Sequence, residues 1–142
     1  MPITFARIDP RTDARYPLEL ELRFRVLRQP LGMPRATIGF AGEENAVHLI
    51  AVDEGALVGC VLFDFASGRL RAMAVEPALQ GTGIGAQLVT GLEAELKKLG
   101  VQTISLHARD TAIGFYEKLG YSIEGAPFTE VSIPHHNMVK ML

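Results

Sequence analysis

Three alternating glycines in the middle of the chain are the residues whose spacing most directly indicates chemistry. They lie in the segment Gln-Gly-Thr-Gly-Ile-Gly at residues 80–85, between an apolar run at 70–75 and a helical apolar pattern at 86–99. Glycine lets the main chain approach a ligand closely. The first amide groups of a helix have no partner within the helix and lie at the positive end of its dipole. Because one glycine would suffice for a tight turn, three of them indicate an anion site, best suited to phosphate.

The order of the remaining elements predicts an α/β fold that holds this turn between a strand and a helix. Hydrophobic periodicity and turn residues predict strands at residues 3–8, 46–52, 56–65, 69–75, 101–107, 121–124 and 128–138, and helices at 16–28, 86–99 and 110–119. A strand, helix and strand in succession form a right-handed parallel unit. We therefore expect a mixed sheet, with an antiparallel meander leading into the glycine segment.

Two segments near the N-terminus need separate interpretation. Residues 16–28 alternate as a half-buried strand would, but Glu19 precedes Arg23 by one helical turn and a second such pair follows, which favours a helix. Residues 29–45 contain two prolines and three glycines and are the least regular part of the chain. Long loops inside compact domains are often functional, so we expect this one to shape a substrate pocket.

Composition limits the class of protein. The 142 residues are 48% hydrophobic, enough for one domain with a sizeable core, and the formal net charge is −2. Basic residues are scattered, which argues against a nucleic-acid or anionic-membrane partner. We see no secretory signal and no apolar stretch of membrane-spanning length. The single cysteine, Cys60, excludes an internal disulfide and fits a reducing, cytoplasmic setting.

Three glycine-rich patterns compete for the segment 80–85. A P-loop requires a lysine after its last glycine, and none follows Gly85. A dinucleotide fingerprint should leave its strand directly and be followed by an acidic residue at the end of the next strand, and residues 101–107 contain none. The third pattern is Gln-x-x-Gly-x-Gly, which Gln80, Gly83 and Gly85 satisfy.

This third pattern resembles the signature of the GNAT superfamily of N-acetyltransferases, which use acetyl-CoA. A second segment, 112–121, resembles the Ala-x-x-Phe-Tyr-x-x-x-Gly-aromatic segment of the same family. Residues 23–32 and 128–138 further resemble an uncharacterised bacterial branch. The resemblance covers most of the chain and rests on two motifs at the expected separation.

The resemblance implies both a fold and a co-substrate. It implies one acetyltransferase domain over residues 1–142, with a mostly antiparallel sheet of about six or seven strands that is splayed between the fourth and fifth strands and flanked by helices. It implies acetyl-CoA and no metal, with the pyrophosphate on the amides of 81–85 and the pantetheine arm along 73–75. The implied cofactor-binding residues are Met73, Ala74, Val75, Gln80, Gly81, Thr82, Gly83, Ile84 and Gly85.

The resemblance also implies catalytic roles. Tyr116 matches the general acid of the family, since a phenol with a pKa of about 10 stays protonated at neutral pH and can give a proton to a leaving thiolate. Glu130 and His135 lie in the segment that borders the acceptor side and are the first candidates for the base. Further candidates are His107, Glu43, Glu44 and an ordered water. Arg109 stands where the family often has asparagine, and either a CoA phosphate or solvent is its expected neighbour.

The leading hypothesis is direct acetyl transfer from acetyl-CoA to an amine. Cys60 lies in an apolar strand, where a buried thiol is the default, so an acetyl-cysteine route is disfavoured. A CoA-binding sensor without turnover is the alternative, because a fold does not fix a function, and a dehydrogenase is a distant third. The acceptor, a small molecule or a peptide, stays unspecified, although Glu43 and Glu44 would attract a cationic amine. Pairing through the last strands would give a homodimer.

Overall fold

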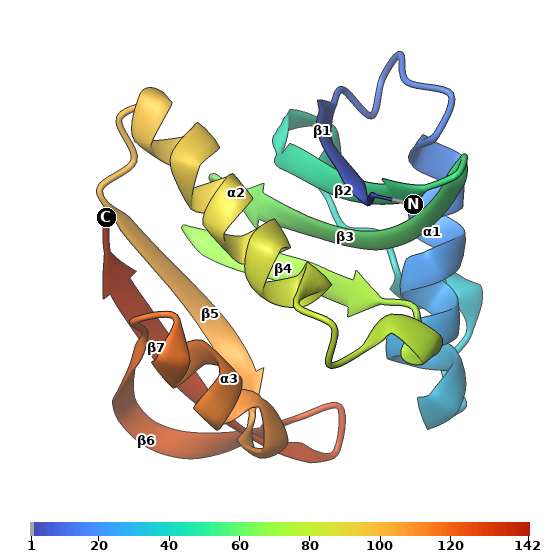
Figure 1. Cartoon of the computed structure of the whole chain (residues 1–142). Coiled ribbons are helices and arrows are strands. Elements are labelled where there is room, and N and C mark those ends of the chain that lie inside the picture. Colours follow the sequence, from blue (N-terminus) through green and yellow to red (C-terminus); the bar gives the residue numbers. More distant parts are fainter. Residues whose placement is uncertain (1) are drawn as a thin grey trace.

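The computed structural model describes residues 2–142 as one seven-stranded sheet flanked by helices (Figure 1). The strands are β1 (Thr4–Ile8), β2 (Val47–Asp53), β3 (Ala56–Asp64), β4 (Arg69–Val75), β5 (Thr103–Arg109), β6 (Ser122–Glu130) and β7 (Ile133–Met141). The helices are α1 (Tyr16–Arg23), α2 (Ile84–Lys98) and α3 (Ile113–Lys118). Within residues 2–142, no helix is both long and apolar enough to cross a membrane.

The sheet opens between its fourth and fifth strands. The spatial order is β1-β2-β3-β4-β5-β7-β6, and every neighbouring pair is antiparallel except β4 and β5. These two parallel strands are joined only at Arg69 and Ser105, so they diverge toward Val75 and Arg109. The predicted mixed, mostly antiparallel sheet with a splay at this position is confirmed.

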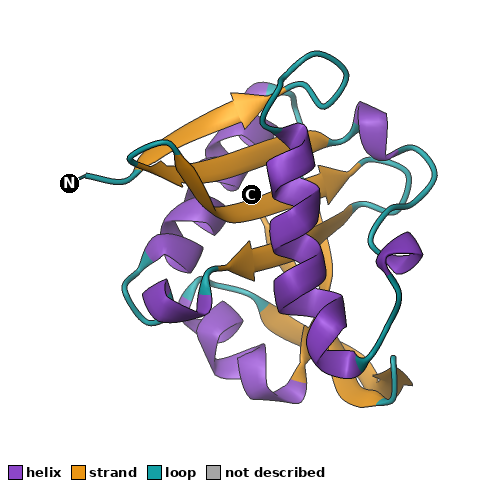
Figure 2. Cartoon of the chain, turned by 90° about the vertical axis from the view of Figure 1, so that its right-hand side faces the viewer, coloured by secondary structure: helices purple, strands orange, loops and turns teal. Residues whose placement is uncertain are grey.

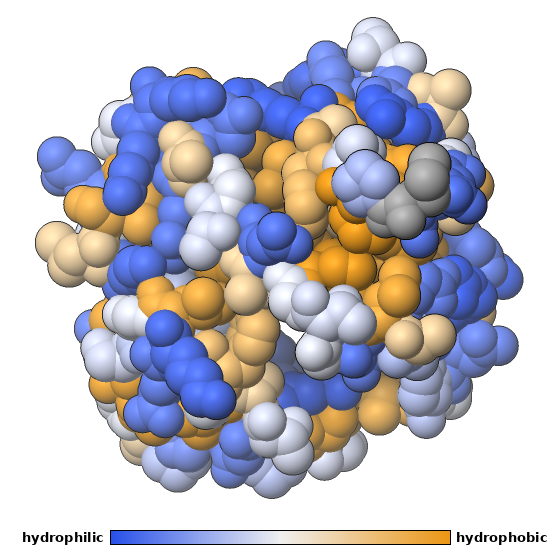
Figure 3. All heavy atoms as spheres, in the orientation of Figure 1, coloured by the Kyte–Doolittle hydropathy of each residue, from blue (hydrophilic) through white to orange (hydrophobic). Residues whose placement is uncertain are grey.

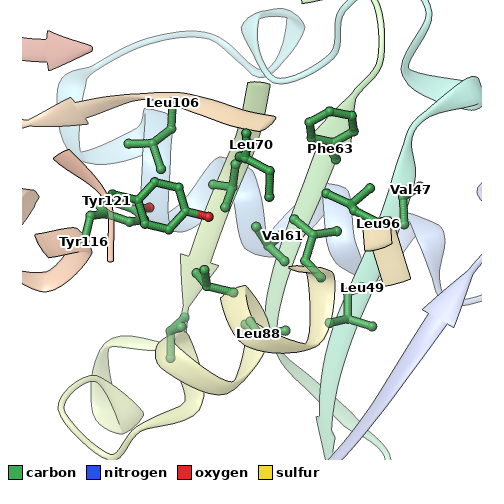
Figure 4. Close-up of a cluster of buried hydrophobic side chains, with 14 of the residues drawn as sticks. Val47, Leu49, Val61, Phe63, Leu70, Leu88, Leu96, Leu106, Tyr116 and Tyr121 are labelled. Carbon is green, nitrogen blue, oxygen red and sulfur yellow. The ribbon is translucent and has the colours of Figure 1, made fainter. Parts of the chain in front are cut away.

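Helices cover both faces of the sheet. Figures 1 and 2 show α2 and α3 on one face and α1 on the other. Alternation along β2 accounts for this: Leu49 and Ala51 belong to the cluster under α2, whereas Ile50 belongs to the cluster under α1. Figure 4 shows the larger cluster, where Leu88 and Leu96 of α2 point toward the sheet.

The segment 16–28 is helical, as predicted, but not uniformly. Helix α1 ends at Arg23, and the chain continues through a π-helical turn, Phe24–Arg28, into short 3-10 turns of the irregular segment 29–45. π-helical turns are frequent at functional sites. Here the turn is followed directly by the loop that covers one side of the open sheet.

The prediction of a single last strand over residues 128–138 is wrong. A turn at Val131 and Ser132 divides it, so that Glu130 ends β6 and Ile133 begins β7. Both turn residues have positive φ, 46° and 63°. Such turns usually contain glycine or asparagine, and the absence of that signal explains the error. The predicted strand 121–124 is in turn the start of β6, which continues past an irregularity between Glu124 and Phe128.

Candidate functional site

A cavity of about 870 Å³ occupies the space that the divergence of β4 and β5 leaves open. Its walls come from β4, the glycine turn and start of α2, the end of β5 with α3, the loop residues 37–40, and the β6–β7 turn. In Figure 3 the surface is hollowed between α3 and the N-terminal end of α2. The cavity therefore reaches both faces of the sheet and connects the glycine turn with the loop side.

The glycine turn is shaped to leave amide groups and space at the cavity. Gly81 and Gly83 have φ of 82° and 93°, and a Cβ added at either would meet no atom within 4 Å. The amide of Gln87 donates to the Gly83 carbonyl oxygen at 3.1 Å and makes the first bond of the helix. The main-chain amides of residues 84–86, which lie between Gly83 and Gln87, have no hydrogen-bond partner within the helix. The site thus fits a phosphate group held by main-chain N–H donors.

The structure brings most of the expected cofactor residues to this cavity. The lining residues among them are Met73, Ala74, Val75, Gln80, Gly81, Gly83 and Gly85. Gln80 Nε2 also donates to the Val75 carbonyl oxygen at 3.2 Å, which fixes the turn to the end of β4. Thr82 and Ile84 do not line the cavity: Thr82 is exposed and donates to the Leu79 carbonyl, and the Ile84 side chain is 4% exposed in the core under α2. The Thr82 amide also donates to the Leu79 carbonyl oxygen, at 3.3 Å, so of these two residues only the Ile84 main-chain amide remains as a contact for a ligand.

Tyr116 projects from α3 to the cavity and is 8% exposed. It packs edge-on against Phe115 and Tyr121, with ring centroids 4.9 and 5.7 Å away, and Figure 4 shows the two tyrosines side by side at the margin of the core. The Tyr121 hydroxyl donates to Glu93 at 2.8 Å, whereas that of Tyr116 makes no hydrogen bond within residues 2–142. Burial raises the pKa of Tyr116 to about 12. Its hydroxyl is therefore protonated and available as a donor at the cavity.

Glu130, His135 and His107 come together on the opposite wall. Glu130 Oε1 lies 3.0 Å from His107 Nδ1, and Glu130 Oε2 lies 3.6 Å from His135 Nε2. His135 Nδ1 is 2.7 Å from the Ile133 carbonyl oxygen, which only accepts, so the proton is on Nδ1 and Nε2 faces Glu130. Burial, the largest single influence, opposes ionisation of Glu130, but the hydrogen bond from His107 and the nearby basic groups together outweigh it, and the pKa of Glu130 is lowered. The wall therefore carries a carboxylate that His107 hydrogen-bonds, with the His135 ring beside it.

Comparison with known proteins identifies the family. The model of the family described as "Acetyltransferase (GNAT) domain" matches residues 33–142. The chain belongs to the GNAT acetyltransferase family. Acyl transfer is the class of reaction that this family and its structural neighbours support.

Three GNAT relatives and neighbours illustrate the similarity. "Uncharacterized protein YyaT" of Bacillus subtilis (strain 168) is 32% identical over 100 residues, which cover 69% of this chain and 68% of that protein. An acyl-CoA N-acyltransferase from Pseudomonas aeruginosa superposes with a TM-score of 0.84 at 19% identity, over 98% of this chain and 99% of the other. The PaiA N-acetyltransferase from Thermoplasma acidophilum, solved with coenzyme A, gives a TM-score of 0.76 at 17% identity over the whole of both chains. The two structures show a common fold.

Two acidic candidates for the base in this GNAT domain lie outside the cavity. Glu43 is 3% exposed and bonded to Arg23 and Tyr16, and Glu44 lies at a separate, smaller hollow near Pro10. Neither lines the main cavity, so the expectation that they attract a cationic amine there is wrong. A proline- and glycine-rich loop usually exposes its acidic residues to solvent. The ion pair with Arg23 instead holds Glu43 in the core.

Glu43 belongs to a buried charged cluster with Glu19, Arg23 and His48. Arg23 NH1 lies 3.1 Å from Glu19 and 2.5 Å from Glu43, and each of the four residues is 3% exposed or less. Donor atoms of Glu19, Glu43 and His48 lie within 4.8 Å of one another, as metal ligands would. The guanidinium already contacts both carboxylates, so Arg23 serves as the cation of this cluster. The cluster ties α1 and the loop before β2 to the sheet.

Four arginines line the cavity: Arg28, Arg69, Arg71 and Arg109. Of these the sequence singled out Arg109 alone, with a CoA phosphate or solvent as its expected neighbour, and the other three were not predicted. A signal was available, because Arg69 and Arg71 are two residues apart on one strand and His107 and Arg109 are two apart on the next. A spacing of two places both members of each pair on one face of the sheet.

Cys60 is buried away from the cavity, as expected from its apolar strand. Its thiol donates to the Ala72 carbonyl oxygen at 3.4 Å, and burial raises its pKa.

Proposed function

We propose that this GNAT domain, acting as one unit over residues 1–142, transfers an acetyl group from acetyl-CoA to an amine by direct transfer. The observation that carries the proposal is a single cavity that joins three features: the open edge of β4, the glycine turn at the start of α2, and the Tyr116 hydroxyl. The single cysteine fits a cytoplasmic setting.

The residues at the cavity fit coenzyme A. The amides of the glycine turn would hold the pyrophosphate, and the unpaired edge of β4 from Met73 to Val75 would hydrogen-bond the pantetheine arm. Aminoglycoside 6′-N-acetyltransferase, a neighbour with a TM-score of 0.79 at 21% identity, was also solved with coenzyme A, which supports this reading. Bound acetyl-CoA would supply the thioester carbonyl and the leaving sulfur.

Tyr116 is the proposed proton donor to the sulfur. Its pKa of about 12 lies above that of an ordinary thiol, about 8.5. The hydroxyl therefore keeps its proton until negative charge has developed on the sulfur, and stabilises that charge as a hydrogen-bond donor. A free hydroxyl at the cavity is what this role requires.

Glu130 is the proposed acceptor of the amine proton, directly or through a water, with His107 holding it in place. An amine attacks only when it is neutral, so one proton must leave it during transfer. Cys60 is buried away from the cavity, which supports transfer without an acetyl-cysteine. The lowered pKa of Glu130 keeps it ionised and able to take a proton across the neutral range.

Calorimetric titration with acetyl-CoA, with free CoA and NADH as comparisons, tests the proposed co-substrate. Binding of acetyl-CoA without binding of NADH is the expected result. A folded protein that binds neither acetyl-CoA nor CoA would reduce the glycine turn to a structural feature and contradict the proposal.

Substitution of Tyr116 by phenylalanine separates an enzyme from a CoA-binding sensor. We expect kcat to fall by about 100-fold, the usual contribution of a positioned acid, with acetyl-CoA affinity retained. Tyr121→Phe is the matched control, because this hydroxyl is buried against Glu93 and does not line the cavity. Its acetyl transfer should stay near the wild-type rate. Equal effects of the two substitutions would remove Tyr116 from the mechanism.

A further inference from the structure

The cavity wall opposite α2 is built from basic side chains. Along β4, Leu70 is buried in the core under α2, so its neighbours Arg69 and Arg71 point to the other face. Along β5, Leu106 and Ala108 are buried in the same core, which places His107 and Arg109 on that other face as well. Two strands thus present four basic side chains to the loop side of the cavity, away from the face that α2 covers.

Arg28 adds a fifth basic group from across the cavity. It ends the π-helical turn after α1 and reaches only main-chain oxygens, those of Thr37 at 3.4 Å and Leu27 at 3.3 Å. Arg69 contacts the His107 ring at 2.6 Å. Within residues 2–142, no carboxylate oxygen lies within 4.0 Å of the Arg28, Arg69 or Arg109 guanidinium group.

Negative charge at the cavity does not balance these arginines. Glu130 is the one acidic residue of the described chain that lines it, and it is engaged by His107 and His135. Arg71 has Asp64 at 3.5 Å and stacks over Phe40 at 3.8 Å. Arg23, which also reaches the cavity, is neutralised by its buried carboxylates.

The arginines lie close to one another at a site that is partly shielded from water. Burial, followed by the charges of Arg109 and Arg23, lowers the pKa of Arg28. Burial, followed by the charge of Arg71, lowers the pKa of Arg69. Arginine remains charged in proteins, so these side chains form a region of uncompensated positive charge, which an anion between them would relieve.

We propose that the acceptor is a small amine that carries a carboxylate or phosphate group, bound by Arg28, Arg69 and Arg109. This inference rests on the proposed acetyl transfer and specifies its substrate class. Guanidinium groups bind both kinds of anion through paired N–H donors. The same positive field disfavours the ammonium form of the bound acceptor and so favours the neutral amine that attacks.

Matched pairs of amines test the inference, with kcat/KM for acetyl transfer as the readout. β-Alanine is compared with its amide, and phosphoethanolamine with ethanolamine, so that the two anion types are separated. We expect at least one anionic member to exceed its neutral partner by about tenfold or more. In Arg69→Gln and Arg109→Gln this ratio should fall toward one. Arg7→Gln, on β1 and away from the cavity, should leave it unchanged.

Two results of this comparison would overturn the inference. The first is a preference for the neutral partners, or an anionic preference that survives both substitutions. The second is loss of acetyl-CoA affinity in Arg69→Gln and Arg109→Gln with the acceptor ratio unchanged, which would assign the arginines to the phosphates of the co-substrate.

Failure of the proposed function is recognised separately. If acetyl-CoA does not bind, or no amine is acetylated, phosphoethanolamine and β-alanine are titrated calorimetrically into the protein alone and into CoA-saturated protein. Binding of either that Arg69→Gln and Arg109→Gln abolish supports the anion site. Absence of binding in the wild type counts against it.

Discussion

The two sides of the cavity present different kinds of chemical group. On the α2 side the groups that face the cavity are main-chain amides and glycines that follow one another over residues 81–85. On the α1 side they are long charged side chains from β4, β5, the π-helical turn and the β6–β7 turn. Main-chain amides would suit the pyrophosphate of the proposed co-substrate, whereas basic side chains would suit the anionic group of the proposed acceptor.

The two sides also differ in what holds them in place. The glycine turn is fixed by helix α2, whose leucines pack into the larger core, and by one hydrogen bond from Gln80. The loop on the α1 side is fixed by the buried cluster of Glu19, Arg23, Glu43 and His48, with Arg23 also donating to the Ile38 carbonyl. The wall proposed for the acceptor therefore depends on charges inside the protein, and the wall proposed for acetyl-CoA on apolar packing.

The largest expected effect is on stability, from Arg23→Ala. Removal of the guanidinium leaves Glu19 and Glu43 buried without their shared cation, and breaking a buried ion pair in this way costs about 3–5 kcal/mol of unfolding free energy. Chemical denaturation measures the loss. The control is Arg25→Ala, whose side chain is 40% exposed and pairs with Glu76 at the surface, where about 1 kcal/mol or less is expected. Equal losses in the two variants would show that the cluster does not anchor the loop.

An intermediate effect is expected on the other wall, from Gly83→Ala. A residue with a Cβ at φ of 93° is strained by about 1–2 kcal/mol, and the added methyl group enters the space above the turn. We expect acetyl-CoA affinity to fall by about tenfold, the equivalent of 1.4 kcal/mol. Gly55→Ala is the matched control, because Gly55 in the turn between β2 and β3 has φ of 84°, has open space around it and does not line the cavity. Both variants should lose similar stability, but only Gly83→Ala should lose affinity. If Gly55→Ala weakens binding as much, strain alone explains the effect.

The contrast between the walls explains what could be predicted from the sequence. The glycine turn lies within six consecutive residues between a strand and a helix, so its spacing was sufficient to place it and to predict the splay of the sheet through the family resemblance. The arginine wall draws on residues 28, 69, 71 and 109, which only the folded sheet brings together. Its local signal, the alternation of charged and buried residues on β4 and β5, predicts a shared face but not a shared cavity.

The errors of prediction have a common physical origin in tertiary contacts. Val131 and Ser132 adopt a left-handed turn that their residue types disfavour, which placed the end of β6 incorrectly. Glu43 is drawn into the core by Arg23, so a loop acid became a buried one. The local sequence favoured an uninterrupted strand in the first case and an exposed acid in the second. Contacts with the rest of the fold outweighed both local preferences.

The smallest expected effect is a change of stability with pH that belongs to the acceptor side alone. His48 is fully buried, with Nδ1 3.0 Å from the Glu19 carboxylate and Nε2 2.9 Å from the Glu43 carbonyl oxygen. Both nitrogens face acceptors, an arrangement that favours the doubly protonated ring in the folded protein. Burial, the largest single influence, opposes this, but the hydrogen bonds to Glu19 and Glu43 and the charges of these two residues together outweigh it, and the pKa of His48 is raised above 6.5.

Because the folded state binds this proton more tightly than the unfolded state, its contribution to stability is complete below about pH 6.5 and is lost as pH rises through the raised pKa. One proton limits the slope to about 1.4 kcal/mol per pH unit. Urea denaturation of the wild type and His48→Gln, at intervals from pH 6 to 9, measures it. The wild type should lose stability over this range, while His48→Gln, less stable at pH 6, should lose less. Parallel curves for the two proteins would mean that the imidazole is neutral in the folded state. The buried cluster would then contain two carboxylates, Glu19 and Glu43, and a single positive charge, that of Arg23.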